Sequence, residues 1–60
     1  MVPADAVILL SWCNTKLRDE YSSLGALCEE YGASEAEIRA KISTIGYVYE
    51  EKSNRFVPNT

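Results

Sequence analysis

The chain has 60 residues, of which 47% are hydrophobic and 25% charged, and its formal net charge is −3. This length allows one small domain spanning residues 1–60, and the composition is that of a globular protein, which excludes a disordered or collagen-like chain. The acidic balance argues against nucleic acid and anionic membranes as partners, because affinity for both depends on Lys and Arg contacts with phosphates.

Neither a targeting segment nor a membrane span is expected. The apolar run at residues 6–10 is too short for a signal-peptide core and has no basic residue before it. We therefore expect a cytoplasmic protein in which Cys13 and Cys28 are reduced thiols buried in the core, with a disulfide or redox role as the alternative. Because the sequence has no histidine, no metal site or cofactor is expected.

A first helix is predicted over residues 5–19, after Pro3 and a capping Asp5. One apolar stripe would face the core, formed by Val7, Leu10, Cys13, Leu17 and Tyr21. Ile8 and Trp12 lie on nearly the opposite side of this helix. Either these two side chains pack under the C-terminal segment, or they form an exposed patch that contacts a partner.

The next stretch predicts a helix over residues 23–31. Ser22 and Ser23 are good N-caps, because a serine hydroxyl can accept a hydrogen bond from a free N–H in the first turn. Gly32 ends the helix, since glycine adopts the left-handed conformation without a Cβ clash. Four side chains at helical spacing are expected in the core: Leu24, Leu27, Cys28 and Tyr31.

A third helix is predicted over residues 35–45. Ser34 and Glu37 match a capping box, in which each side chain satisfies an N–H at the helix start. The residues expected to face the core are Ala36, Ile38, Ile42 and Ile45, and Gly46 ends the helix. Two helices joined by a short turn with glycine are typical of a helix-turn-helix or a plain αα-hairpin, and both predict the same core.

The period then changes to that of a β-hairpin over residues 47–57. Aromatic and β-branched residues flank a turn at residues 51–54. This turn pairs Glu50 with Arg55, Tyr49 with Phe56, and Val48 with Val57. We expect the aromatic face to pack on the helices, Pro58 to end the second strand, and Asn59 and Thr60 to be frayed.

Three helices followed by a hairpin look like a minimal winged-helix or helix-turn-helix DNA-binding domain, and residues 29–34 are similar to the turn of that motif. The resemblance implies a groove-facing surface made by Ser34, Glu35, Ala36, Arg39 and Ala40. One guanidinium, two alanines and an acid are a poor surface for reading base edges. A nucleic-acid binder that uses Ser34, Arg39 and Lys41 is therefore the alternative function.

A second resemblance covers nearly the whole chain. It is carried by Leu9-Leu10-Ser11, Asn14, Lys16-Leu17-Arg18-Asp19, Tyr21-Ser22-Ser23-Leu24, Leu27-Cys28, Ile45-Gly46-Tyr47, Tyr49, Asn54 and Phe56. On these residues the chain resembles the small bacterial proteins of the domain of unknown function 4250 family. The resemblance implies a compact bacterial single domain with no established activity.

The sequence predicts no catalytic site. Histidine, the usual acid or base at neutral pH, is absent, and the side chains of the adjacent carboxylates Glu29 and Glu30 diverge on a helix. A core this small also leaves little room for the usual ligand pocket of about 300 to 1,000 Å³. We therefore do not expect an enzyme.

The expected fold is mainly α, with three short helices in a helix-turn-helix-like arrangement followed by a small C-terminal β-hairpin. The expected function is that of a non-enzymatic protein-interaction module. Its contact surface would be Ile8, Trp12, Lys16 and Asp19, which share one side of the first helix. The partner would be another protein or a second copy of the chain.

Overall fold

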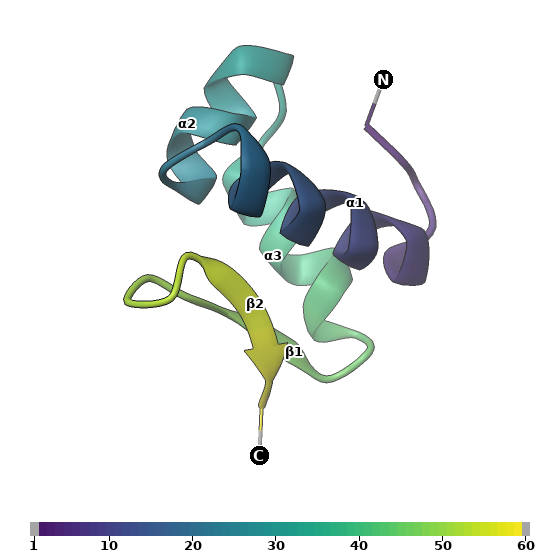
Figure 1. Cartoon of the computed structure of the whole chain (residues 1–60). Coiled ribbons are helices and arrows are strands. Elements are labelled where there is room, and N and C mark those ends of the chain that lie inside the picture. Colours follow the sequence, from purple (N-terminus) through teal and green to yellow (C-terminus); the bar gives the residue numbers. More distant parts are fainter. Residues whose placement is uncertain (1, 60) are drawn as a thin grey trace.

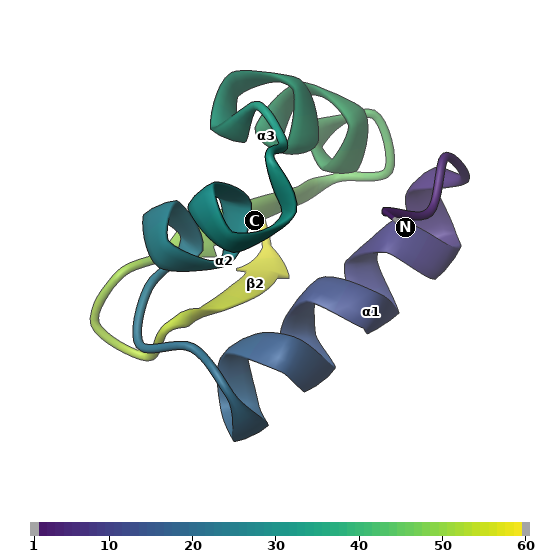
Figure 2. The ribbon, with the colours of Figure 1, turned by 90° about the horizontal axis from the view of Figure 1, so that it is seen from above.

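A computed structural model describes residues 2–59 as three helices followed by a two-stranded antiparallel hairpin (Figure 1). The elements are α1 (Ala6–Asp19), α2 (Leu24–Tyr31), α3 (Glu35–Ser43), β1 (Tyr47–Glu50) and β2 (Arg55–Pro58). The helices lie over one face of the hairpin, with α1 on the β2 side and α3 on the β1 side (Figure 2). The mainly α fold class predicted from the sequence is confirmed.

Each helix begins at the kind of capping side chain that the sequence predicted. The acceptors and donors are Asp5 Oδ2 with Ile8 N–H (3.0 Å), Ser23 Oγ with Ala26 N–H (3.1 Å), and Ser34 Oγ with Glu37 N–H (3.3 Å). Gly32 ends α2 in the left-handed conformation, with φ of 62°. The three helix starts and the tight turn between α2 and α3 therefore follow from local sequence.

The core joins all three helices to one strand residue. Its buried members are Leu9, Cys13, Leu17, Leu24, Leu27, Cys28, Ile38, Ile42 and Phe56. The stripe predicted for the first helix was wrong at its start, because Leu9 is fully buried while Val7 is 62% exposed. The reason is that α1 contacts α2 and α3 on one side and β2 on the other, so the face between these contacts runs through Leu9, Cys13 and Leu17.

The third helix ends two residues earlier than predicted and buries a narrower face. Ile38 and Ile42 are buried, whereas Ala36 is exposed, contrary to the prediction, and Ile45 is half-buried. After Ser43 the chain forms a 3₁₀-type turn, in which each N–H donates to the carbonyl three residues before it. These bonds run from Thr44, Ile45 and Gly46 to Lys41, Ile42 and Ser43, so the last turn is no longer α-helical.

The predicted hairpin register is confirmed, with Val48 opposite Val57, Tyr49 opposite Phe56 and Glu50 opposite Arg55. The aromatic face packs inward as expected, since Phe56 is buried and Val48, on the other face, is 39% exposed. Pro58 is the last residue of β2, as predicted. Asn59 was expected to be frayed, but its N–H donates to the Gly46 carbonyl at 2.8 Å. The predicted fraying of Thr60 lies outside the described residues.

Candidate functional site

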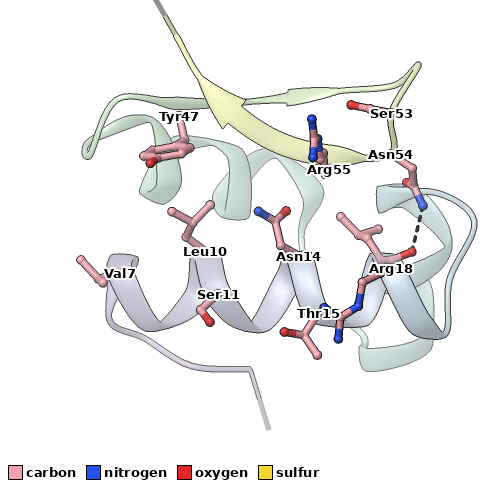
Figure 3. A pocket seen from close by; sticks show the side chains of 11 residues that line it. Val7, Leu10, Ser11, Asn14, Thr15, Arg18, Tyr47, Ser53, Asn54 and Arg55 are labelled. Carbon is pink, nitrogen blue, oxygen red and sulfur yellow. Dashed lines mark hydrogen bonds between the residues drawn. The ribbon is translucent and has the colours of Figure 1, made fainter.

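A groove of about 780 Å³ runs between α1 and the hairpin (Figure 3). Its lining residues are Val7, Leu10, Ser11, Asn14, Thr15, Leu17, Arg18, Tyr47, Ser53, Asn54 and Arg55. Leu10 and Asn14 point from the helix towards the hairpin, whereas Ser11 and Thr15 point away from it. The groove is larger than the chain length led us to expect, and it is open to solvent, since about half of its lining residues are exposed.

The floor of this groove is a helix side chain that pairs with β2 as a neighbouring strand would. Asn14 Oδ1 accepts a hydrogen bond from Phe56 N–H at 2.8 Å, and Asn14 Nδ2 donates to the Phe56 carbonyl at 3.2 Å. The next residue on β2 that points the same way is Pro58, which has no N–H to offer. Asn14 and Pro58 together close the outer edge of β2 to another strand.

A second asparagine ties the hairpin turn to the helices. Asn54 has a φ of 52°, and its Nδ2 donates to the carbonyls of Leu17 (3.1 Å) and Tyr21 (2.9 Å). Its Oδ1 accepts from the Tyr49 hydroxyl at 2.6 Å, and that hydroxyl accepts from Leu24 N–H at 3.2 Å. The end of α1, the start of α2, β1 and the hairpin turn therefore meet at one polar network.

Sequence reasoning missed the role of Asn14 and Asn54. Asn14 appeared only among the residues that carry the family resemblance, and Asn54 appeared there and as the last residue of the predicted turn. One signal was present: Asn14 follows Leu10 by four residues and precedes Leu17 by three, so it shares their side of the helix. Nothing in the local pattern showed that a strand backbone, 42 residues away, would meet it.

The four predicted interface residues lie along α1 in different environments. Ile8 is 59% exposed, but Trp12 is half-buried and packs edge-on against Tyr31 of α2, with ring centroids 5.0 Å apart. Trp12 therefore packs on α2 rather than under the hairpin. Lys16 Nζ pairs with Glu20 at 3.0 Å and lies 5.9 Å from the centre of the Tyr31 ring.

Charges at the end of α1 are also paired. Arg18 binds Asp19 through two hydrogen bonds of 2.9 and 3.1 Å, and these hold the pKa of Asp19 below its usual range. The Glu20 hydrogen bond raises the pKa of Lys16. Both pairs are exposed, so each contributes little to stability, but they leave this end of the helix with no large net charge.

The three residues of the alternative nucleic-acid surface do not form one basic patch. Ser34 is occupied as the cap of α3. Arg39 pairs with Glu35 at 2.7 Å and stacks over the Tyr49 ring at 5.2 Å, so it faces the hairpin. Lys41 lies on another side of α3, beside Pro3 and Glu37. A guanidinium bound to a carboxylate is less free to contact a phosphate.

Both cysteines are free and buried, as predicted. Burial raises the pKa of the Cys13 thiol from its ordinary 9.0 to about 12, and the nearby Cys28 adds to the effect. A thiol held in its neutral form is a poor nucleophile and a poor metal ligand. Within residues 2–59, no three His, Cys, Asp or Glu side chains are grouped so as to hold a metal ion, and no helix is long and apolar enough to span a membrane.

Comparison with known proteins gives one match. No curated protein and no solved structure matches the chain. The family model described as "Domain of unknown function (DUF4250)" matches residues 3–56, a span that contains all three helices and both asparagine anchors. The chain therefore belongs to the DUF4250 family.

Proposed function

We propose that the protein is a non-enzymatic protein-interaction module that binds its partner on the exposed side of α1. One observation carries this proposal: Val7 and Ile8, neighbours in the first turn of α1, are 62% and 59% exposed. Within residues 2–59, the only other exposed large hydrophobic side chain is that of Val48, at 39%. Exposed aliphatic side chains that are neighbours on a helix offer apolar area that a protein partner can cover.

The surroundings of this pair support a protein partner. Trp12, one turn further along α1, is fixed against Tyr31 and presents a rigid apolar flank, as interface anchors commonly do. The charges beyond it are neutralised in the pairs Lys16–Glu20 and Arg18–Asp19. Contact at this surface would therefore be mainly apolar, with a paired polar rim.

Photo-crosslinking tests this proposal. We would place benzoylphenylalanine at position 8 and, as the control, at position 52 in the exposed hairpin turn, and irradiate each protein in extract of its native host. We expect one adduct from position 8 that excess wild-type chain competes away and a V7S/I8S double variant does not. The adduct mass distinguishes another protein from a second copy. Equal adducts from both positions, or none from position 8, would contradict the proposal.

Nucleic acid is tested in parallel. Mixed-sequence duplex DNA added at low salt would shift the amide signals of Ser34, Arg39 and Lys41 if α3 were a recognition helix, and the shifts would disappear as salt is raised. We expect an unchanged spectrum, because the chain carries a net charge of −3 and Arg39 is paired with Glu35.

A further inference from the structure

Hydrogen-bonded and non-hydrogen-bonded residue pairs alternate along the hairpin, so the identity of one pair fixes the direction of every backbone group in β1. Because Phe56 directs its N–H and carbonyl to Asn14, Tyr49 and Phe56 are a non-hydrogen-bonded pair of the antiparallel ladder. The bond from the Asn59 N–H to the Gly46 carbonyl agrees with this alternation, because it makes Tyr47 and Pro58 the next non-hydrogen-bonded pair. The N–H and carbonyl groups of Tyr47 and Tyr49 therefore point away from β2, at the outer edge of the hairpin.

These four backbone groups have no partner in the part of the chain that the structure describes. The recorded backbone bonds outside helices and ladder include none from Tyr47 or Tyr49, and the side-chain bonds of Tyr49 use only its hydroxyl. An edge strand with free groups is a template for another strand. On β2 both Phe56 groups are bonded to Asn14 and Pro58 has no N–H, so the β2 edge offers no N–H to another strand, whereas the β1 edge does.

The third helix stands beside the open edge. Seen from above, α3 lies over the β1 side of the hairpin and α1 over the β2 side (Figure 2), and a pocket of about 270 Å³ lies where α3 meets β1. The pocket is lined by Arg39, Ala40 and Ser43 of α3 and by Tyr47, Val48, Tyr49 and Phe56 of the hairpin. Ala40 and Ser43 are small, so they leave room for a side chain beside β1.

We propose that an extended segment of a partner protein adds to the outer edge of β1 as a third, antiparallel strand and inserts an apolar side chain into the pocket under α3. The segment would form four hydrogen bonds with Tyr47 and Tyr49. Its side chains opposite these two residues would face α3, because directly opposed residues share one face of a sheet. Aromatic rings and Ala40 line much of that space, so an aliphatic or aromatic side chain fits it.

The geometry favours a peptide over a second copy as the occupant. An added strand needs only the spacing of about 4.8 Å between neighbouring strands. A second copy paired through β1 would also bring its own α3 to the outer edge of β1, where the first α3 already lies. The pocket under α3 is lined by residues of α3 and the hairpin and by none of α1, although the Tyr47 side chain also lines the groove that Val7 borders. It is therefore a second binding surface and does not depend on the function proposed above.

The test uses a defined probe, the acetylated and amidated pentapeptide Thr-Val-Thr-Val-Thr, titrated into labelled protein. We expect saturable downfield shifts of the Tyr47 and Tyr49 amide protons, with a dissociation constant between about 0.1 and 10 mM, as backbone pairing by a short strand would give. The matched control is the same peptide N-methylated at both valines, which lacks the two donors and should leave the shifts absent.

Two variants separate this site from the α1 surface. A40L fills the pocket at an exposed position and should weaken peptide binding at least fivefold, whereas I8S, at an exposed α1 residue that lines neither the groove nor the pocket, should leave it unchanged. Equal shifts with the N-methylated peptide, no shifts with either peptide, or equal binding by A40L would overturn the proposal. Movement of the Tyr47 and Tyr49 signals with protein concentration alone would overturn the choice of occupant, because it would show that a second copy pairs with β1.

Discussion

The two edges of the hairpin differ in whether their backbone groups are hydrogen-bonded to the rest of the chain. On the β2 side, α1 supplies Asn14, whose amide makes both hydrogen bonds that a neighbouring strand would make with Phe56, and Pro58 removes the next donor. On the β1 side, the backbone groups of Tyr47 and Tyr49 face a pocket beside α3. A two-stranded sheet is only marginally stable by itself, so the contacts of its edges with the helices matter. Here one side-chain amide decides which edge can pair with another strand.

The largest effect is expected at the anchor of the hairpin turn. Asn54 makes three hydrogen bonds, so N54A should lower the free energy of unfolding by about 3 kcal/mol, at roughly 1 kcal/mol for each bond. N54G should lose about 1 kcal/mol less, because glycine adopts the φ of 52° without strain. Urea denaturation measures both, with K52A in the same turn, at an exposed residue, as the control. A loss for N54A no larger than that of K52A would contradict the role of this network.

Opening the closed edge should have the next largest effect. N14A leaves the Phe56 N–H and carbonyl without protein partners, and we expect the free energy of unfolding to fall by about 2 kcal/mol. N14D keeps an acceptor for the Phe56 N–H but places a carboxylate oxygen against the Phe56 carbonyl, where two acceptors repel, so its loss should be at least as large. T15A, one residue away and exposed, is the control in the same denaturation series. If N14A matched T15A, water would be replacing the amide and the edge would not be closed by Asn14.

A smaller effect should distinguish the two tyrosines of β1. The Tyr49 hydroxyl bridges Asn54 and Leu24 N–H, so Y49F should lower the free energy of unfolding by about 1 kcal/mol. Y47F removes a hydroxyl that makes no hydrogen bond within residues 2–59, so its stability should remain within about 0.5 kcal/mol of wild type. Equal losses for both variants would show that the bridge does not stabilise the hairpin.

The core between the two edges should respond only to high pH. Because the folded pKa of Cys13 is raised from 9.0 to about 12, the unfolded state releases its proton first as pH rises. The stability that the neutral Cys13 thiol contributes is therefore fully present below pH 9. Above pH 9 the free energy of unfolding falls by up to about 1.4 kcal/mol per pH unit. Denaturation at pH 7 and pH 10 should show a larger loss for wild type than for C13A. An equal loss in both proteins would contradict the burial of this thiol.

Local sequence predicted the elements of this fold well, because each has its signal within a few residues. Ser23, Ser34 and Gly32 specify helix ends through bonds within one turn, and the register of the hairpin follows from the four-residue turn. What could not be predicted depends on contacts between distant segments. The exposure of Val7, the packing of Trp12 on Tyr31 and the pairing of Asn14 with Phe56 all follow from how α1 is rotated against its neighbours.

The candidate surfaces were predictable to different degrees. The exposed Ile8 lies where an apolar residue off the core stripe was expected to lie, so periodicity alone pointed to it. The open edge of β1 was not predictable, because it depends on which backbone groups Asn14 occupies on the other strand. Pairing of a side chain with a strand backbone leaves no periodic signal in sequence.

Amide hydrogen exchange of the folded protein tests the difference between the two edges most directly. We expect slow exchange at Val48, Phe56 and Val57, whose N–H groups bond across the ladder or to Asn14, and fast exchange at Tyr47 and Tyr49 on the outer edge of β1. The exchange of Phe56 should become fast in N14A, while Val48 and Val57 stay slower. Protection of Tyr47 and Tyr49 equal to that of Phe56 would show that β1 already has a partner, and it would contradict the open edge.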